Sequence, residues 1–145
     1  PGGSYIPSHS VAILNTDLDL PPGPSTMDIH CVMQNDINSW YLTPHMHNWG
    51  TNYTASVTHA GTKSMLVDHL VWDPTFMFEP PAQKFDPATP FKLVTGDQFD
   101  VHCEWNNDTG ADLTFGNEMC VFYLQSIDTA GLGNIDCDNG SWGSF

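Results

Sequence analysis

The hydrophobic and polar residues of this chain alternate with the period of two that is typical of β-strands. In "QFDVHCEW", residues 98–105, one face of the strand would carry Phe99, Val101, Cys103 and Trp105. In "MDIHCVM", residues 27–33, the same rule places together Ile29, Cys31 and Met33. Such a pattern predicts a sheet with one dry face and one solvated face.

Short runs of this kind alternate with clusters of Pro, Gly, Asn and Asp, which favours an all-β sandwich or barrel. We expect strands at Val11–Leu14, Met27–Met33, Asn38–His47, Asn52–His59, Ser64–Trp72, Lys92–Val94, Gln98–Trp105, Asp112–Phe115 and Met119–Ser126. The long, Pro-rich connection 73–90 should lie on the surface, where it could act as a lid.

We expect one domain over residues 1–145, with its core at about residues 11–126. The tail, residues 127–145, is too rich in Gly and Asn to predict a regular element, but Cys137 would tie it down.

The same alternation predicts which face of its strand a histidine occupies. His30 and His102 fall on the polar faces of their strands, so we expect them to be solvated. His69 falls on the apolar side of "MLVDHLVW", which predicts a core histidine or an extra metal ligand. His9 and His59 carry no local signal.

The chain is strongly acidic, with 17 acidic residues, three lysines, no arginine and a formal net charge of −14. This charge repels nucleic acid and anionic membranes and draws cations toward the surface, although it could equally serve solubility or a saline habitat. Without a basic patch to neutralise phosphates, nucleic-acid binding is excluded.

No apolar run approaches the length of a membrane span, and residues 1–10 do not resemble a signal peptide. We therefore expect a mature protein or an excised domain.

Four cysteines form an even set: Cys31, Cys103, Cys120 and Cys137. They include no CxxC pair, so two disulfides in an oxidising compartment, extracellular or periplasmic, are the better interpretation than a metal knuckle. Three connectivities remain open.

The stretch "TPHMHNWG", residues 43–50, contains the best candidate for chemistry. If a strand continues through it, His45 and His47 point to the same side, where they either bind one metal or lie on a wet face. Two imidazoles suit Cu, Zn, Ni or Fe, and the third ligand decides among them. No Glu follows the pair, as a cupin would require, and no His follows Cys120, as a blue-copper site would require.

The order of "PHMHNWG", "WD", "GDQFDVHCEWN", "FG" and "EMC" resembles the second domain of the copper type II, ascorbate-dependent monooxygenases. This family contains the peptidylglycine α-hydroxylating and dopamine β-monooxygenases. The similarity runs from about Asn15 to Ser126. It implies a jelly-roll-like β-sandwich of eight or nine antiparallel strands, with disulfides Cys31–Cys137 and Cys103–Cys120.

The resemblance also implies that His45, His47 and Met119 hold one copper ion, at which dioxygen is activated and a substrate C–H bond is attacked. It implies ascorbate or a similar reductant, and a substrate pocket lined by Tyr123. A thioether is a soft ligand that favours Cu(I), which agrees with this set. The alternative for Met119 is packing in the core beside a disulfide.

Three departures from the family pattern concern function. Thr43 stands where peptide-processing members have an arginine that binds the substrate carboxylate, and Val121 stands where an Asn follows "EMC". The family's second copper site, in a separate N-terminal domain with adjacent histidines, has no counterpart here.

We therefore expect the oxygen-activating copper domain of a secreted or periplasmic monooxygenase that acts on an unidentified small molecule or peptide. One alternative is a single-copper binding or carrier protein without turnover. Another is a metal-free β-sandwich whose histidines bind a partner.

Overall fold

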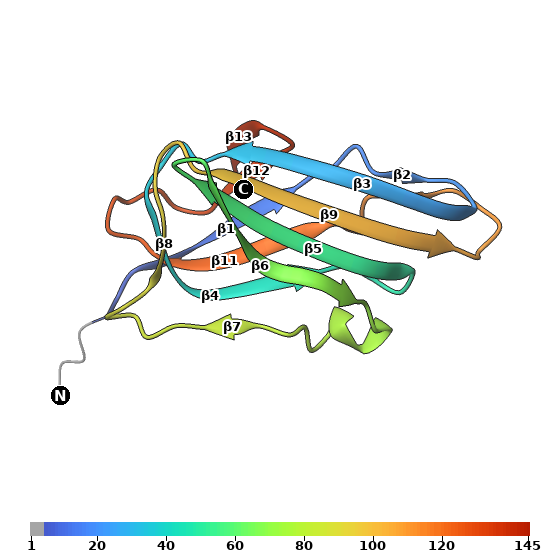
Figure 1. Cartoon of the computed structure of the whole chain (residues 1–145), viewed down its shortest axis with the longest axis horizontal. Coiled ribbons are helices and arrows are strands. Elements are labelled where there is room, and N and C mark those ends of the chain that lie inside the picture. Colours follow the sequence, from blue (N-terminus) through green and yellow to red (C-terminus); the bar gives the residue numbers. More distant parts are fainter. Residues whose placement is uncertain (1–4) are drawn as a thin grey trace.

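The computed structural model describes residues 5–145, which form an all-β, sandwich-like fold (Figure 1). The larger sheet has the strand order β13-β12-β1-β11-β4-β7, and β8 also pairs with β4. Its strands are β1 (Ser8–Leu14), β4 (Ile37–His45), β7 (Gln83–Lys84), β8 (Phe91–Leu93), β11 (Val121–Ile127), β12 (Ile135–Asp138) and β13 (Ser141–Ser144).

The second sheet has the order β3-β9-β5-β6, and a short ribbon pairs β10 with β2. These strands are β3 (Gly23–Val32), β9 (Gln98–Asn107), β5 (Gly50–His59), β6 (Thr62–Val71), β10 (Leu113–Thr114) and β2 (Asp19–Leu20). Among residues 5–145 the only helix is the 3-10 turn η1 (Pro74–Met77), and no helix there has the length and apolarity needed to cross a bilayer.

The core lies between the two sheets and uses the faces that alternation predicts. The four apolar residues of "QFDVHCEW" and the three of "MDIHCVM" are all buried. The ring of Phe99 in β9 meets that of Phe122 in β11, with 5.1 Å between their centroids. Tyr53 of β5 donates its hydroxyl to the carbonyl of Val121 at 2.7 Å. Both contacts join the second sheet to β11 of the larger sheet.

Both disulfides that the family resemblance implies are present. Cys31–Cys137 joins β3 to β12 and therefore links the two sheets. Cys103–Cys120 joins β9 to the residue that precedes β11. No free cysteine is left in the described chain.

All nine expected strands are confirmed, with shifted ends, but the expectation of an irregular tail was wrong. In the tail, β12 runs parallel to β1, with Cys137 opposite Ile13, and β13 pairs back onto β12. The Asn and Gly residues that discouraged a strand form the turn between them, where Asn139 and Gly140 have φ of 43° and 98°. Since Ile135 and Cys137 are buried, the core extends beyond residue 126.

The connection 73–90 runs along the edge of the sandwich and is fastened there. Its strand β7 pairs with Tyr41 and Leu42 of β4. The side-chain amide of Gln83 donates to the carbonyl of Leu66 in β6. This segment therefore bridges an edge strand of one sheet and a strand of the other.

Candidate metal centre

His45 and His47 come together, although the expected strand through residue 47 was wrong. β4 ends at His45, because the chain turns there and buries Met46 completely in the core. The turn nevertheless leaves the two imidazole centroids 5.1 Å apart, with the rings nearly perpendicular at 84°. Two neighbouring imidazoles are thus presented together at one end of the larger sheet.

The imidazole of His47 is oriented by its own neighbours. Its Nδ1–H donates to the carbonyl of Asn117 at 3.0 Å, which leaves Nε2 with a free lone pair in the neutral ring. The indole N–H of Trp72, from the "WD" motif, donates to the carbonyl of His47 at 2.8 Å. A ring whose second nitrogen is held by a carbonyl is the usual arrangement of a metal-ligating histidine.

His45 is half-buried, and its environment favours the neutral imidazole over the charged form. Burial lowers the pKa of His45 below the ordinary histidine value, and the neighbouring His47 lowers it further. A metal binds the neutral form of imidazole, so a lowered pKa reduces the competition from protons.

Glu118 joins the two segments of the candidate site. Its carboxylate is fully buried, and its Oε1 accepts the backbone N–H of His47 at 2.5 Å and that of Met119 at 2.9 Å. Its Oε2 accepts the backbone N–H of Trp49 at 3.0 Å. Because the backbone N–H groups of His47 and Met119 bond to the same oxygen atom, the two backbone nitrogens are held close together.

Sequence reasoning missed this role of Glu118. The available signal was an acidic residue between "FGN" and a cysteine that is expected to be buried, since a buried glutamate is rare unless it is partnered.

Met119 lies half-buried on the outer face of the larger sheet. It packs with Phe115 and Tyr123 against a small apolar cluster made of Ala12, Leu14 and Val121. Val121 in β11 lies opposite His45 in β4. Met119 comes two residues before Val121 in the chain. The Cys103–Cys120 disulfide fixes the residue between them.

Tyr123 lies next to the histidine pair. It is opposite Thr43 in the pairing of β11 with β4, and its ring centroid is 6.0 Å from that of His45. Burial raises the pKa of the Tyr123 hydroxyl above its usual value, so it is a neutral hydrogen-bonding group at physiological pH. The structure therefore brings all four predicted site residues to one region.

The donor set restricts which metal can fit. Among residues 5–145, no group of three or more His, Cys, Asp or Glu side chains is arranged to hold a metal ion. Both oxygens of Glu118 accept backbone N–H groups, so this carboxylate is not a free ligand. A metal at this place would depend on two imidazoles and the thioether of Met119.

The expectation that His69 is a core residue was wrong. Its side chain is 77% exposed, and its φ is 46°. The pairing of β5 with β6 shifts register around Ala55: Leu70 lies opposite Tyr53 and Val67 opposite Ala55, so three steps along β6 match two along β5. This bulge breaks the alternation that placed His69 on the apolar side.

The expectation that His30 and His102 lie on a solvated face is confirmed. Their Nδ1 atoms lie 2.6 Å from Asp100 and 2.7 Å from Asp28, on the outer face of the second sheet. The other two histidines, His9 and His59, lie away from the candidate site and are described below.

Comparisons of the chain with protein-family models and with curated proteins found no match. The similarity to the copper monooxygenases therefore rests on the order and spacing of the motifs quoted above.

Proposed function

We propose that His45, His47 and Met119 bind one copper ion, and that this domain is the oxygen-activating part of a secreted or periplasmic copper-dependent monooxygenase. The observation that carries the proposal is the shared carboxylate of Glu118. It joins the "HMH" segment to the "EMC" segment, the two motifs that contain the proposed ligands.

The residues present fit copper better than other common metals. Two neutral imidazoles with a polarisable thioether favour Cu(I), whereas zinc sites are built from Cys, His, Asp and Glu. When bound, copper would supply a redox-active centre with an open position for dioxygen. Electrons would come from ascorbate or a similar donor, by way of a partner copper domain outside this chain.

The protein side chains would orient the ligands and receive the substrate. The bond from His47 Nδ1–H to the carbonyl of Asn117 leaves Nε2 of His47 available, and Nε2 would be the ligand atom. Tyr123, beside His45, offers a neutral hydroxyl on the same face. Thr43, opposite Tyr123, is neutral, and the chain has no arginine. We therefore propose a small-molecule or peptide substrate that is not recognised through a carboxylate.

Two disulfides agree with a secreted or periplasmic location, because such bonds persist in oxidising compartments.

The proposal is tested by titration of the protein with Cu(I) in competition with a chromogenic chelator. We expect one copper ion per chain, and a large loss of affinity in His45→Ala. The matched control is His30→Ala, which removes a histidine from the outer face of the second sheet and should leave copper binding unchanged. Unchanged stoichiometry and affinity in His45→Ala would contradict the proposed site.

A single-copper binding or carrier protein without turnover is the second candidate. It is favoured by the soft thioether of Met119, which suits Cu(I), and by the net charge of −14, which draws cations toward the surface. Ascorbate-dependent hydroxylation by the protein with its native neighbouring domains distinguishes the two candidates. The enzyme reading expects turnover that Met119→Ile removes, and equal turnover in both proteins would contradict it.

A further inference from the structure

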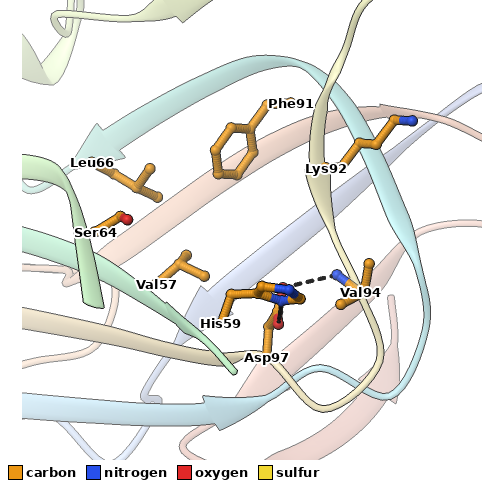
Figure 2. Close-up of a pocket in the computed structure, with 8 residues that line it drawn as sticks. All are labelled: Val57, His59, Ser64, Leu66, Phe91, Lys92, Val94 and Asp97. Carbon is orange, nitrogen blue, oxygen red and sulfur yellow. Dashed lines mark hydrogen bonds and ion pairs between the residues drawn. The ribbon is translucent and has the colours of Figure 1, made fainter. Parts of the chain in front are cut away.

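A cavity of about 320 Å³ opens at the far end of the sandwich from the histidine pair. It lies between residues of β5 and β6 in one sheet and residues at and after β8 in the other (Figure 2). β8 pairs with Ile37–Ser39, the start of β4, whereas His45 ends that strand. At about 3.3 Å per residue, the two ends are roughly 20 Å apart. The cavity is therefore separate from the proposed copper site and does not depend on it.

Most of the cavity wall is apolar. Phe91 faces Val57 and Leu66 across the opening, and Val94 lies beside His59 (Figure 2). The stem of Lys92 forms part of the rim, but its amino group points away from the other labelled side chains. A cavity of ~150 Å³ is large enough for benzene, so this one can hold a substituted ring. Its size and lining are those of a small-molecule site at the lower end of the usual range.

One polar group in the cavity is fixed in orientation. His59 Nδ1 lies 2.6 Å from Oδ1 of Asp97, a carboxylate that is only 4% exposed. The other oxygen of Asp97 accepts the backbone N–H of Val94 at 2.9 Å. Since an ionised carboxylate only accepts hydrogen bonds, Nδ1 carries the proton. In the neutral ring, Nε2 of His59 is then a hydrogen-bond acceptor, and no side chain or backbone group in residues 5–145 bonds to it.

We propose that this cavity binds a small phenol, whose ring packs against Phe91, Val57 and Leu66 and whose hydroxyl donates to Nε2 of His59. A ligand with an apolar body and one donor group matches a wall of this composition with one fixed acceptor. An aromatic body is favoured over an alkyl chain because it stacks on Phe91 and has few torsions to immobilise on binding.

The test is a titration of the full chain with 4-methylphenol at pH 8, followed through the methyl NMR signals of Val57, Leu66 and Val94. Toluene, which is smaller, and 4-methylanisole, which is larger, both lack the hydroxyl donor. We expect 4-methylphenol to shift these three residues and to bind at least tenfold more tightly than either analogue. Equal affinity for all three compounds, or no shift of the three residues at millimolar phenol, would overturn the proposal.

Variants identify the acceptor. His59→Phe keeps an aromatic ring but removes both ring nitrogens, so it should bind 4-methylphenol and toluene equally. The matched control is His30→Phe: His30 is also exposed and its Nδ1 also contacts a carboxylate, but it lies on the open face of the second sheet. His30→Phe should keep the tenfold preference. Loss of the preference in His30→Phe, or its persistence in a folded His59→Phe, would overturn the proposal. The comparison of ligands on the unmodified protein remains decisive if a variant does not fold.

Discussion

His47 and Met119 donate their backbone N–H groups to the same oxygen of the buried Glu118 side chain. The candidate ligands come from segments that are distant in the sequence, and they are brought together by one carboxylate rather than by a continuous strand. Because a carboxylate in a buried position is costly unless it is satisfied, this contact has one stable geometry. The position of Met119 relative to the histidines is therefore built into the fold.

Replacement of Glu118 should weaken both folding and copper binding. Glu118→Ala leaves the buried N–H of His47 and the half-buried N–H groups of Trp49 and Met119 without their acceptor, so we expect a loss of at least about 1–3 kcal/mol in the free energy of unfolding. Glu118→Gln can keep its oxygen on His47 and Met119, while its amide faces the N–H of Trp49. The Gln variant should therefore retain most of the Cu(I) affinity. Urea unfolding and chelator competition measure the two effects.

The control for Glu118 is Asp97→Ala, which removes another buried carboxylate at the opposite end of the sandwich. It should lower stability and leave Cu(I) affinity unchanged. A folded Glu118→Ala protein with the copper affinity of the unmodified chain would refute a positioning role for Glu118.

Removal of each disulfide should have a different effect on folding stability and on copper affinity. Cys31–Cys137 closes the longer loop, with a sequence separation of 106 against 17 for Cys103–Cys120. In the chain-entropy model its loss costs more stability, about 4.7 against about 3 kcal/mol. Cys103–Cys120 fixes the residue next to Met119, so its replacement by two serines should cost copper affinity, whereas replacement of the other pair should not. An equal loss of affinity in both double variants would contradict this assignment.

Gly50 is required by the turn that carries the histidines. A Cβ at this position would overlap Cε of Met46 and lie 2.9 Å from Cδ1 of Trp72, whose indole N–H holds His47. Since both neighbours are packed in the core, we expect Gly50→Ala to cost about 1–3 kcal/mol of unfolding free energy. Gly143→Ala is the matched control, because its Cβ would meet only the carboxylate end of the half-buried Asp136 side chain. Similar denaturation midpoints for the two variants would show that the turn can relax.

His9 should make folding stability depend on pH. It is buried opposite Ser126, and burial lowers its pKa below the usual histidine value, against a smaller raising effect of Asp128, 3.6 Å away. As pH falls through about 6.5, the unfolded chain takes up a proton that folded His9 does not, so stability decreases. The contribution of one group is at most about 1.4 kcal/mol per pH unit, and it ends once pH is below the folded pKa.

Urea unfolding between pH 7.5 and 5.5 measures this effect. His9→Leu should reduce the slope of stability against pH, while His30→Leu, on the exposed face of the second sheet, should retain it. An unchanged slope in His9→Leu would show that other groups account for the pH dependence.

The sequence predicted the strands and the faces of β3 and β9 well, because these strands pair regularly and their alternation is uninterrupted. Alternation failed at His69, where a bulge in the β5–β6 pairing changes the phase, an effect that depends on the partner strand. The Gly- and Asn-rich composition of the tail argued against β12, which is stabilised by its pairing with β1 from the other end of the chain.

At the candidate site, too, the sequence predicted some residues, whereas other roles depend on contacts between distant segments. Motif order brought together His45, His47, Met119 and Tyr123, and the structure places the tyrosine ring 6.0 Å from that of His45. The partners of Glu118 and Trp72 could not be read from the sequence, since each contact joins distant segments, although an acidic residue beside a buried cysteine was a signal that Glu118 is partnered. The dyad of His59 and Asp97 has the same origin.

The central claim is that a thioether and two imidazoles bind one copper ion. The most direct measurement is the X-ray absorption spectrum of the Cu(I)-loaded protein, compared with that of Met119→Ile, which keeps an apolar side chain of similar size. We predict one sulfur and two imidazole nitrogens around copper in the unmodified protein, and loss of the sulfur signal in the variant. A spectrum without sulfur in the unmodified protein, or with sulfur retained in Met119→Ile, would contradict the account.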